Sequence, residues 1–244
     1  MLIDETIMGC VLSSGLRQAP ARQAAMKAGI PVTSGATTIN KLCGSGMKAA
    51  MLAHDLIKAG TNNIMVAGGM ESMTNSPYLL MKGRKGMRMG HGEIQDSMFT
   101  DGLEDAASGR SMGSFAQEVA DRYQLTREEM DEFAIQSLRR AQSARDSSSL
   151  KAEIVPITMA TRTGKVCIPD DEQPHKADIS RIPKLRPAFK EHGTVTAANS
   201  SSISDGASAL ILASRKVILE KKLNPMAKFI AHSTNSTEPS EFTL

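Results

Sequence analysis

Helical and extended patterns of apolar residues alternate over the first part of the chain. Residues 18–29 have Pro20 near their start and a glycine at their end, which is typical of a helix. Residues 32–40 are rich in Thr, Val and Ile and predict a strand. Residues 45–59 predict a second helix, and we expect it to be buried because its apolar side chains cover more than one face. Residues 64–67 predict a buried parallel strand, which completes a βαβ unit.

This alternation stops between about residues 73 and 113, where glycines and scattered charges dominate. A long irregular stretch inside a folded domain is usually functional. It contains the basic residues Lys82, Arg84, Lys85 and Arg88. They form either a solvated loop or a contact for a partner subunit or a phosphate, and the pattern leaves both open.

Regular patterns return in the next part of the chain. Thr126 and Glu129 predict a capping box, with a helix behind it that runs to about Arg145. Residues 153–159 and 165–168 predict a hairpin.

In the last part of the chain, residues 195–198 predict the start of one element. Three further elements follow it. Residues 207–213 predict a second buried strand, and Ser214 predicts the cap of a helix that ends near residues 224–225. Residues 228–233 predict a final strand. Because polar sequence without a closing helix follows, we expect an incomplete unit.

Composition excludes several classes of protein. The chain has 244 residues, of which 41% are hydrophobic and 23% charged, a balance typical of a soluble globular protein. No run approaches the ~20 apolar residues that span a bilayer. Asp4 and Glu5 stand where a signal peptide would carry basic and apolar residues. A net charge of +3, with six Phe, two Tyr and no Trp, argues against a nucleic-acid partner.

The three cysteines lie far apart, at Cys10, Cys43 and Cys167, with no CxxC pair. This spacing disfavours a disulfide framework and a zinc site, so we expect no metal centre. A reduced, cytoplasmic location fits best.

Cys43 is the strongest candidate for chemistry because it lies between a predicted strand and a predicted helix. A helix N-terminus offers unpaired N–H groups and the positive end of a dipole, which favour the reactive thiolate and can stabilise an oxyanion. Gly44 and Gly46 would let a ligand approach the backbone. The alternative is a small buried hydrophobic residue, which is common for a free cysteine. None of the five histidines is marked as its base.

A second candidate segment covers residues 194–207 and is dense in short hydroxyl and amide side chains. Such residues cap helices and form turns, and they also bind amide-rich ligands. Alone, this composition does not choose between the two roles.

Several motifs together resemble the thiolase family, in family order along nearly the whole chain. They are QAPARQA at 18–24, TINKLCGSGMK at 38–48, GGMESMTNSPY at 68–78, DGL at 101–103, MG at 112–113, LRPAF at 185–189 and the 194–207 run. The resemblance implies an α/β fold, the thiolase fold, with layered βαβαβ halves and an inserted loop domain.

The resemblance also implies domain boundaries. Residues 1–72 and 204–224 resemble the first half without its opening strand, and residues 73–203 resemble the loop domain. Residues 225–244 resemble the start of a truncated second half.

For function, the resemblance implies acetyl-CoA C-acetyltransferase activity through an acetylated Cys43. A second acetyl-CoA then gives acetoacetyl-CoA and free CoA, and the reverse reaction is thiolysis. Coenzyme A is a thioester substrate here, and no permanently bound cofactor is implied. The family positions that line the pantetheine channel match Leu103, Met112, Phe189, Ala197, Ala198 and Ser201. Ser201 would hydrogen-bond a pantetheine amide. The basic cluster matches a contact region between subunits, so we expect a homodimer or homotetramer.

Three departures from the family pattern leave alternatives open. Ser111 stands where many short-chain thiolases have His, and no clear counterpart of a nucleotide-binding arginine lies near Pro174 and His175. The family's catalytic His and second Cys have no match in this chain, so we expect it to be inactive alone in the full reaction. The alternatives are a longer-chain 3-ketoacyl-CoA thiolase, a non-catalytic CoA-binding or assembly fragment, and a redox-sensing thiol.

Overall fold

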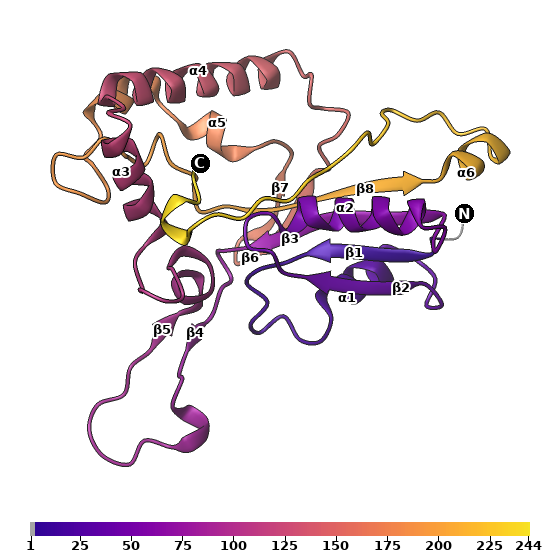
Figure 1. Cartoon of the computed structure of the whole chain (residues 1–244), viewed down its shortest axis with the longest axis horizontal. Coiled ribbons are helices and arrows are strands. Elements are labelled where there is room, and N and C mark those ends of the chain that lie inside the picture. Colours follow the sequence, from indigo (N-terminus) through magenta and orange to yellow (C-terminus); the bar gives the residue numbers. More distant parts are fainter. Residues whose placement is uncertain (1–2) are drawn as a thin grey trace. The chain divides into compact units, whose positions relative to one another are not determined.

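The computed structural model describes residues 3–244, which form two compact units. Unit 1 runs through Ser111 and resumes over Ile203–Thr237, and unit 2 comprises Met112–Ser202 and Glu238–Leu244. The main elements of unit 1, drawn in Figure 1, are β1 (Glu5–Gly9), α1 (Pro20–Lys27), β2 (Gly35–Ile39), α2 (Ser45–Lys58), β3 (Ile64–Ser72), β4 (Tyr78–Leu79), β5 (Gln95–Asp96), β8 (Asp205–Ala213) and α6 (Arg215–Glu220). Those of unit 2 are α3 (Met112–Arg122), α4 (Arg127–Asp146), β6 (Ile157–Thr161), β7 (Gly164–Ile168) and α5 (Glu172–Lys176).

Unit 1 is built on a four-stranded sheet with the order β2-β1-β3-β8. β1 pairs in parallel with both β2 and β3, while β8 runs antiparallel to β3 from Ser72↔Asp205 to Ile64↔Ala213. The predicted βαβ unit is confirmed, but its two strands flank β1, which the pattern did not predict. β1 is short and begins with a charged residue, so its periodicity is weak.

Helix α2 covers the sheet with one face rather than being buried all round. Ala49 and Ala53 are fully buried against Ile7 and Met65 in the main core cluster. Small alanine side chains let the helix axis lie close to the strands. On the opposite face Met47 is 69% exposed, so the expectation of a helix buried all round was wrong.

Unit 2 contains the predicted capping box and hairpin. The hydroxyl of Thr126 accepts a hydrogen bond from the N–H of Glu129, whose carboxylate accepts one from the N–H of Thr126. The hairpin pairs β6 with β7 antiparallel, starting later than predicted. The Arg127 guanidinium contacts the buried Asp131 carboxylate at 2.7 Å, and it also donates to the carbonyl oxygens of Ile182 and Leu185. The ion pair lies within α4, and the hydrogen bonds to the two carbonyl oxygens tie the start of α4 to the chain that follows α5.

Three expectations are corrected by the structure. Residues 228–233 form no strand, because no strand among residues 3–244 pairs with them, and residues 195–198 lie in irregular backbone. The strand over residues 207–213 forms within β8, but it is not buried. It lies at the sheet edge, where Leu210 and Ile211 are 56% and 64% exposed. The predicted Ser214 cap is present, although α6 ends at Glu220.

No helix among the described residues is long and apolar enough to cross a membrane.

Candidate active site

A tight turn joins the end of β2 to the start of α2. Leu42 adopts a left-handed conformation with φ of 47°, which is strained for a leucine. Its N–H donates to the Asn40 side-chain oxygen at 2.9 Å. The Ser45 hydroxyl donates to the Leu42 carbonyl oxygen at 2.6 Å and accepts from the Lys41 N–H at 2.8 Å. These side-chain hydrogen bonds hold the chain in its sharp turn.

Cys43 follows this strained residue and directly precedes Gly44, the N-cap of α2. Its thiol is free and exposed. The predicted position at a strand–turn–helix junction is therefore confirmed. Cys43 thus lies one residue before the N-cap, near the partial positive charge of the first helical turn, a position that suits a nucleophile.

Close backbone packing fixes where the first turn of α2 lies on the sheet. A Cβ added to Gly9, at the end of β1, would lie 2.5 Å from the carbonyl carbon of Ser45. One added to Gly69, in β3, would lie 3.2 Å from the Cα of Gly46. Real Cβ atoms do not approach backbone as closely as 2.5 Å, so position 9 requires glycine, while at position 69 a Cβ would press on the backbone of Gly46. The two glycines thus place the helix N-terminus over the end of β1 and the paired residue of β3.

Cys43 opens into a cavity of about 480 Å³ within unit 1. Its walls come from the residues after β1, the turn before α2, β3, the Gly102–Leu103 segment and the start of β8. Leu12, Leu42 and Leu103 give it apolar walls, and Glu71 is the one carboxylate among the residues that line it. This size and character suit a thin, mostly apolar ligand.

Glu71 has both carboxylate oxygens occupied. They accept the backbone N–H groups of Val11 and Leu12, each at 2.9 Å, and so hold the segment after β1 against the cavity. Cys10 lies beside the same carboxylate, with Sγ 3.8 Å from Oε1. Burial, followed by the negative charge of Glu71, raises the pKa of the Cys10 thiol to about 11. Glu71 is therefore a positioning residue, and Cys10 stays protonated near neutral pH.

Of the predicted channel residues, only Leu103 shares the Cys43 cavity. The other five lie in unit 2, on three segments that contact one another. Met112 begins α3, and the Phe189 ring packs directly against the next residue, Gly113. The N–H of Ala188 donates to the Val195 carbonyl oxygen at 2.9 Å, which brings the third segment alongside. This third segment carries Ala197, Ala198 and Ser201.

Gln117 and Asn199, neither of them predicted as a site residue, hold the segment around residues 194–201 in place. Gln117 is fully buried in α3, and its Oε1 accepts the N–H groups of Thr194 and Val195 at 2.9 Å each. The Asn199 Oδ1 accepts the Thr196 N–H at 2.7 Å, and its Nδ2 donates to the Thr194 carbonyl oxygen at 3.0 Å. Gln117 could have been identified from the sequence as a polar residue at an inward position of a helix, because buried polar groups need hydrogen-bond partners. Ala197 and Ser201 themselves are exposed.

Histidine is absent from the residues described as lining the Cys43 cavity. In unit 1, His54 and His232 meet Asp55 elsewhere, and these three side chains could hold a metal ion.

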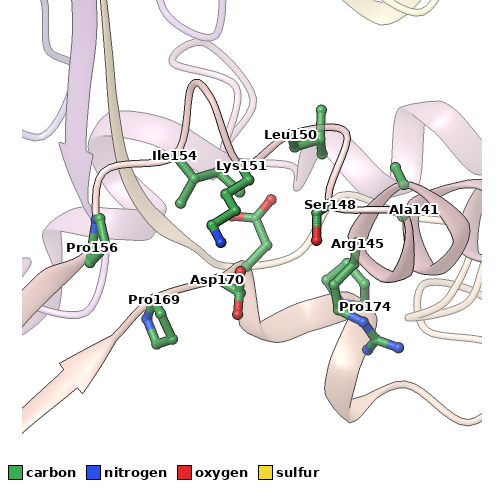
Figure 2. Close-up of a pocket in the computed structure, with 12 residues that line it drawn as sticks. Ala141, Arg145, Ser148, Leu150, Lys151, Ile154, Pro156, Pro169, Asp170 and Pro174 are labelled. Atoms are coloured by element: carbon green, nitrogen blue, oxygen red, sulfur yellow. The ribbon is translucent and has the colours of Figure 1, made fainter.

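A second cavity, of about 530 Å³, lies within unit 2 (Figure 2). It is lined by the end of α4, the loop before β6 and the start of α5, and it contains none of the predicted site residues. Arg145 and Lys151 share it with Asp170 and Asp171, so its cations and carboxylates balance.

Comparison with known proteins agrees with this fold. The family model described as the N-terminal domain of thiolase matches residues 1–216. Acetyl-CoA acetyltransferase 2 of Arabidopsis thaliana is 46% identical over 99% of this chain and 61% of its own length. The acetyl-CoA acetyltransferase of Schizosaccharomyces pombe is 42% identical over 99% of this chain and 62% of its own.

Solved structures of thiolases are also similar to this chain. The crystal structure of Acat5 thiolase from Ascaris suum in complex with coenzyme A superposes with a TM-score of 0.91 at 38% identity, covering 99% of this chain and 62% of that one. The acetyl-CoA acetyltransferase of Syntrophomonas wolfei superposes with a TM-score of 0.85 at 40% identity, covering 92% and 56%.

The structure is a mixed α/β unit with a cysteine at a helix N-terminus beside an apolar cavity. The chain belongs to the thiolase family. It spans 61% of the length of the Arabidopsis relative.

Proposed function

We propose that this chain carries the acyl-accepting part of an acetyl-CoA C-acetyltransferase. The observation that supports the proposal most is the free, exposed thiol of Cys43 at the start of α2, on the wall of a cavity of about 480 Å³. The names of the relatives point to acetyl-CoA as the acyl donor.

In the proposed half-reaction the Cys43 thiolate attacks the carbonyl carbon of the acetyl thioester. A carbon–sulfur bond forms and the carbonyl π electrons move to oxygen, where N–H groups near the helix N-terminus can stabilise the negative charge. The oxyanion then collapses, the bond to the coenzyme A sulfur breaks, and coenzyme A leaves as its thiolate. Cys43 remains acetylated, as two-step covalent catalysis requires.

For the whole protein we propose the condensation of the acetyl group with a second acetyl-CoA, which gives acetoacetyl-CoA, and its reverse. That step needs a base to remove a methyl proton. Among the described residues that line the Cys43 cavity, Glu71 is the one carboxylate, and two backbone N–H groups already occupy it. We therefore assign the first half-reaction to the residues of this chain.

The remaining expectations are proposals that rest on the family resemblance. Leu103 contacts the substrate in the Cys43 cavity. The expected coenzyme A contacts in unit 2 are Met112, Phe189, Ala197, Ala198 and Ser201. Residues 73–203 act as the inserted loop domain, between residues 1–72 and 204–224 of the first half and 225–244 of the second. The basic cluster at residues 82–88 joins subunits of a homo-oligomer in the cytoplasm.

Isotope exchange between acetyl-CoA and labelled free coenzyme A tests the half-reaction, because label enters acetyl-CoA only if an acyl-enzyme forms and reverts. We expect exchange with the unaltered chain, loss of exchange in Cys43→Ser, and full exchange in Cys167→Ser, whose thiol is also exposed. Exchange that survives Cys43→Ser would contradict the proposal. Coenzyme A binding without exchange would instead identify a non-catalytic binding fragment.

A further inference from the structure

Away from the Cys43 cavity, four side chains of unit 1 gather between α2 and the irregular segment after α6. His54 and Asp55 belong to α2, and Phe229 and His232 belong to the segment. None of the four lines the cavity of about 480 Å³. The family match ends at residue 216, before Phe229 and His232.

Nitrogen atoms of both histidines face one carboxylate oxygen of Asp55. The Oδ1 atom of Asp55 lies 3.1 Å from Nδ1 of His54 and 2.8 Å from Nε2 of His232. All three donor atoms lie within 4.8 Å of one another. A tetrahedral Zn²⁺ with bonds of ~2.0–2.2 Å separates its ligand atoms by roughly 3.3 Å. The donors are therefore close to the spacing that such an ion needs.

Ring packing restricts the orientation of both imidazoles. Phe229 stacks on His54 with ring centroids 4.5 Å apart and planes inclined by 24°, and it meets His232 edge-on at 5.8 Å. The two histidine side chains are only 13% and 18% exposed. Rings held in an apolar setting with their nitrogens directed at a common atom are pre-organised for a cation.

The types of donor atom and the exposure of Asp55 indicate which kind of cation would bind. Two imidazoles and one carboxylate suit Zn²⁺ and similar first-row divalent ions, and they suit Mg²⁺ or Ca²⁺ poorly. The Asp55 side chain is 52% exposed, so water can reach a fourth coordination position. Each imidazole would bind the ion through the lone pair of the nitrogen that faces Asp55, with a proton on its other ring nitrogen.

We propose that His54, Asp55 and His232 bind one Zn²⁺-class divalent cation, which fastens the segment around Phe229 to helix α2. The expectation of no metal site rested on cysteine spacing and did not consider histidines far apart in the sequence. This proposal stands independently of acyl transfer, because it uses neither Cys43 nor the residues around it.

The test uses the untagged full chain, stripped of metal with a chelator and titrated with Co²⁺ as a spectroscopic probe. We expect one Co²⁺ per chain, with the visible absorption of a tetrahedral site. His232→Ala and Asp55→Asn should each weaken Co²⁺ binding at least ~10-fold. His91→Ala is the matched control, because His91 is exposed in the loop between β4 and β5 and should leave binding unchanged.

Trypsin cleavage after the exposed Lys228 gives a second measurement that does not depend on the visible absorption of bound Co²⁺. Zn²⁺ should slow this cleavage in the unaltered chain and in His91→Ala, and should have no effect in His232→Ala. Equal Co²⁺ affinity in His232→Ala and the unaltered chain would overturn the proposal. Absence of Co²⁺ binding to the unaltered chain would overturn it as well.

Discussion

Replacing Glu71 by Gln tests whether this carboxylate holds the wall of the Cys43 cavity. The carboxylate accepts the N–H groups of Val11 and Leu12 at 2.9 Å each. Glutamine has nearly the same shape but one acceptor oxygen, so one half-buried N–H group would face an NH₂ donor. Hydrogen bonds to a charged group contribute ~1.5–3 kcal/mol, so we expect a loss of about 2 kcal/mol in the free energy of unfolding.

The assay is unfolding by urea or heat, with Glu93→Gln as the matched control because that side chain is exposed in the loop before β5. A loss of about 2 kcal/mol should lower the Tm by roughly 4–8 °C in a chain of this size. Removing the charge should also lower the pKa of Cys10 and make its thiol easier to alkylate. A Glu71→Gln protein as stable as Glu93→Gln, with Cys10 no more reactive, would refute the reasoning.

Three further predictions follow from the same contacts. Gly9→Ala should destabilise unit 1 and abolish acyl exchange, since its Cβ would lie 2.5 Å from backbone in the first turn of α2; normal exchange would show that this turn can move. Iodoacetamide at pH 8 should alkylate Cys43 and spare Cys10 in the folded chain, because raising the Cys10 pKa from 9.0 to about 11 lowers its thiolate fraction ~100-fold; peptide mapping checks this. Thr126→Ala should lower stability by ~1 kcal/mol in urea unfolding by removing the N-cap of α4, and an unchanged midpoint would contradict it.

The local signals predicted the elements around the candidate site well. Pro20 and the capping residue Thr126 each mark the start of a helix that is present. The glycine pair after the run at 64–67 does not end its strand, because β3 continues through both glycines to Ser72. The position of Cys43 before α2 followed from the same signals. Such signals act within a few residues, so one sequence is enough to identify them.

Features that depend on long-range packing could not be predicted in this way. β1 is held by strands on both sides, so its pairing rather than its own short pattern forms it. The segment at 228–233 has the composition of a strand but has no partner strand, and His232 bonds to α2 instead. Its inward position could mark Gln117 as a buried polar residue, but its partners are backbone groups 77 and 78 residues further along, and no local pattern identifies them.

Peptide mapping by mass spectrometry after brief incubation with acetyl-CoA tests the central claim most directly. Acetylation at Cys43 alone, absent in Cys43→Ser and present in Cys167→Ser, is the result that the account predicts. Acetyl groups spread over Cys43 and Cys167 alike, or found on neither, would contradict a nucleophile positioned by the turn before α2.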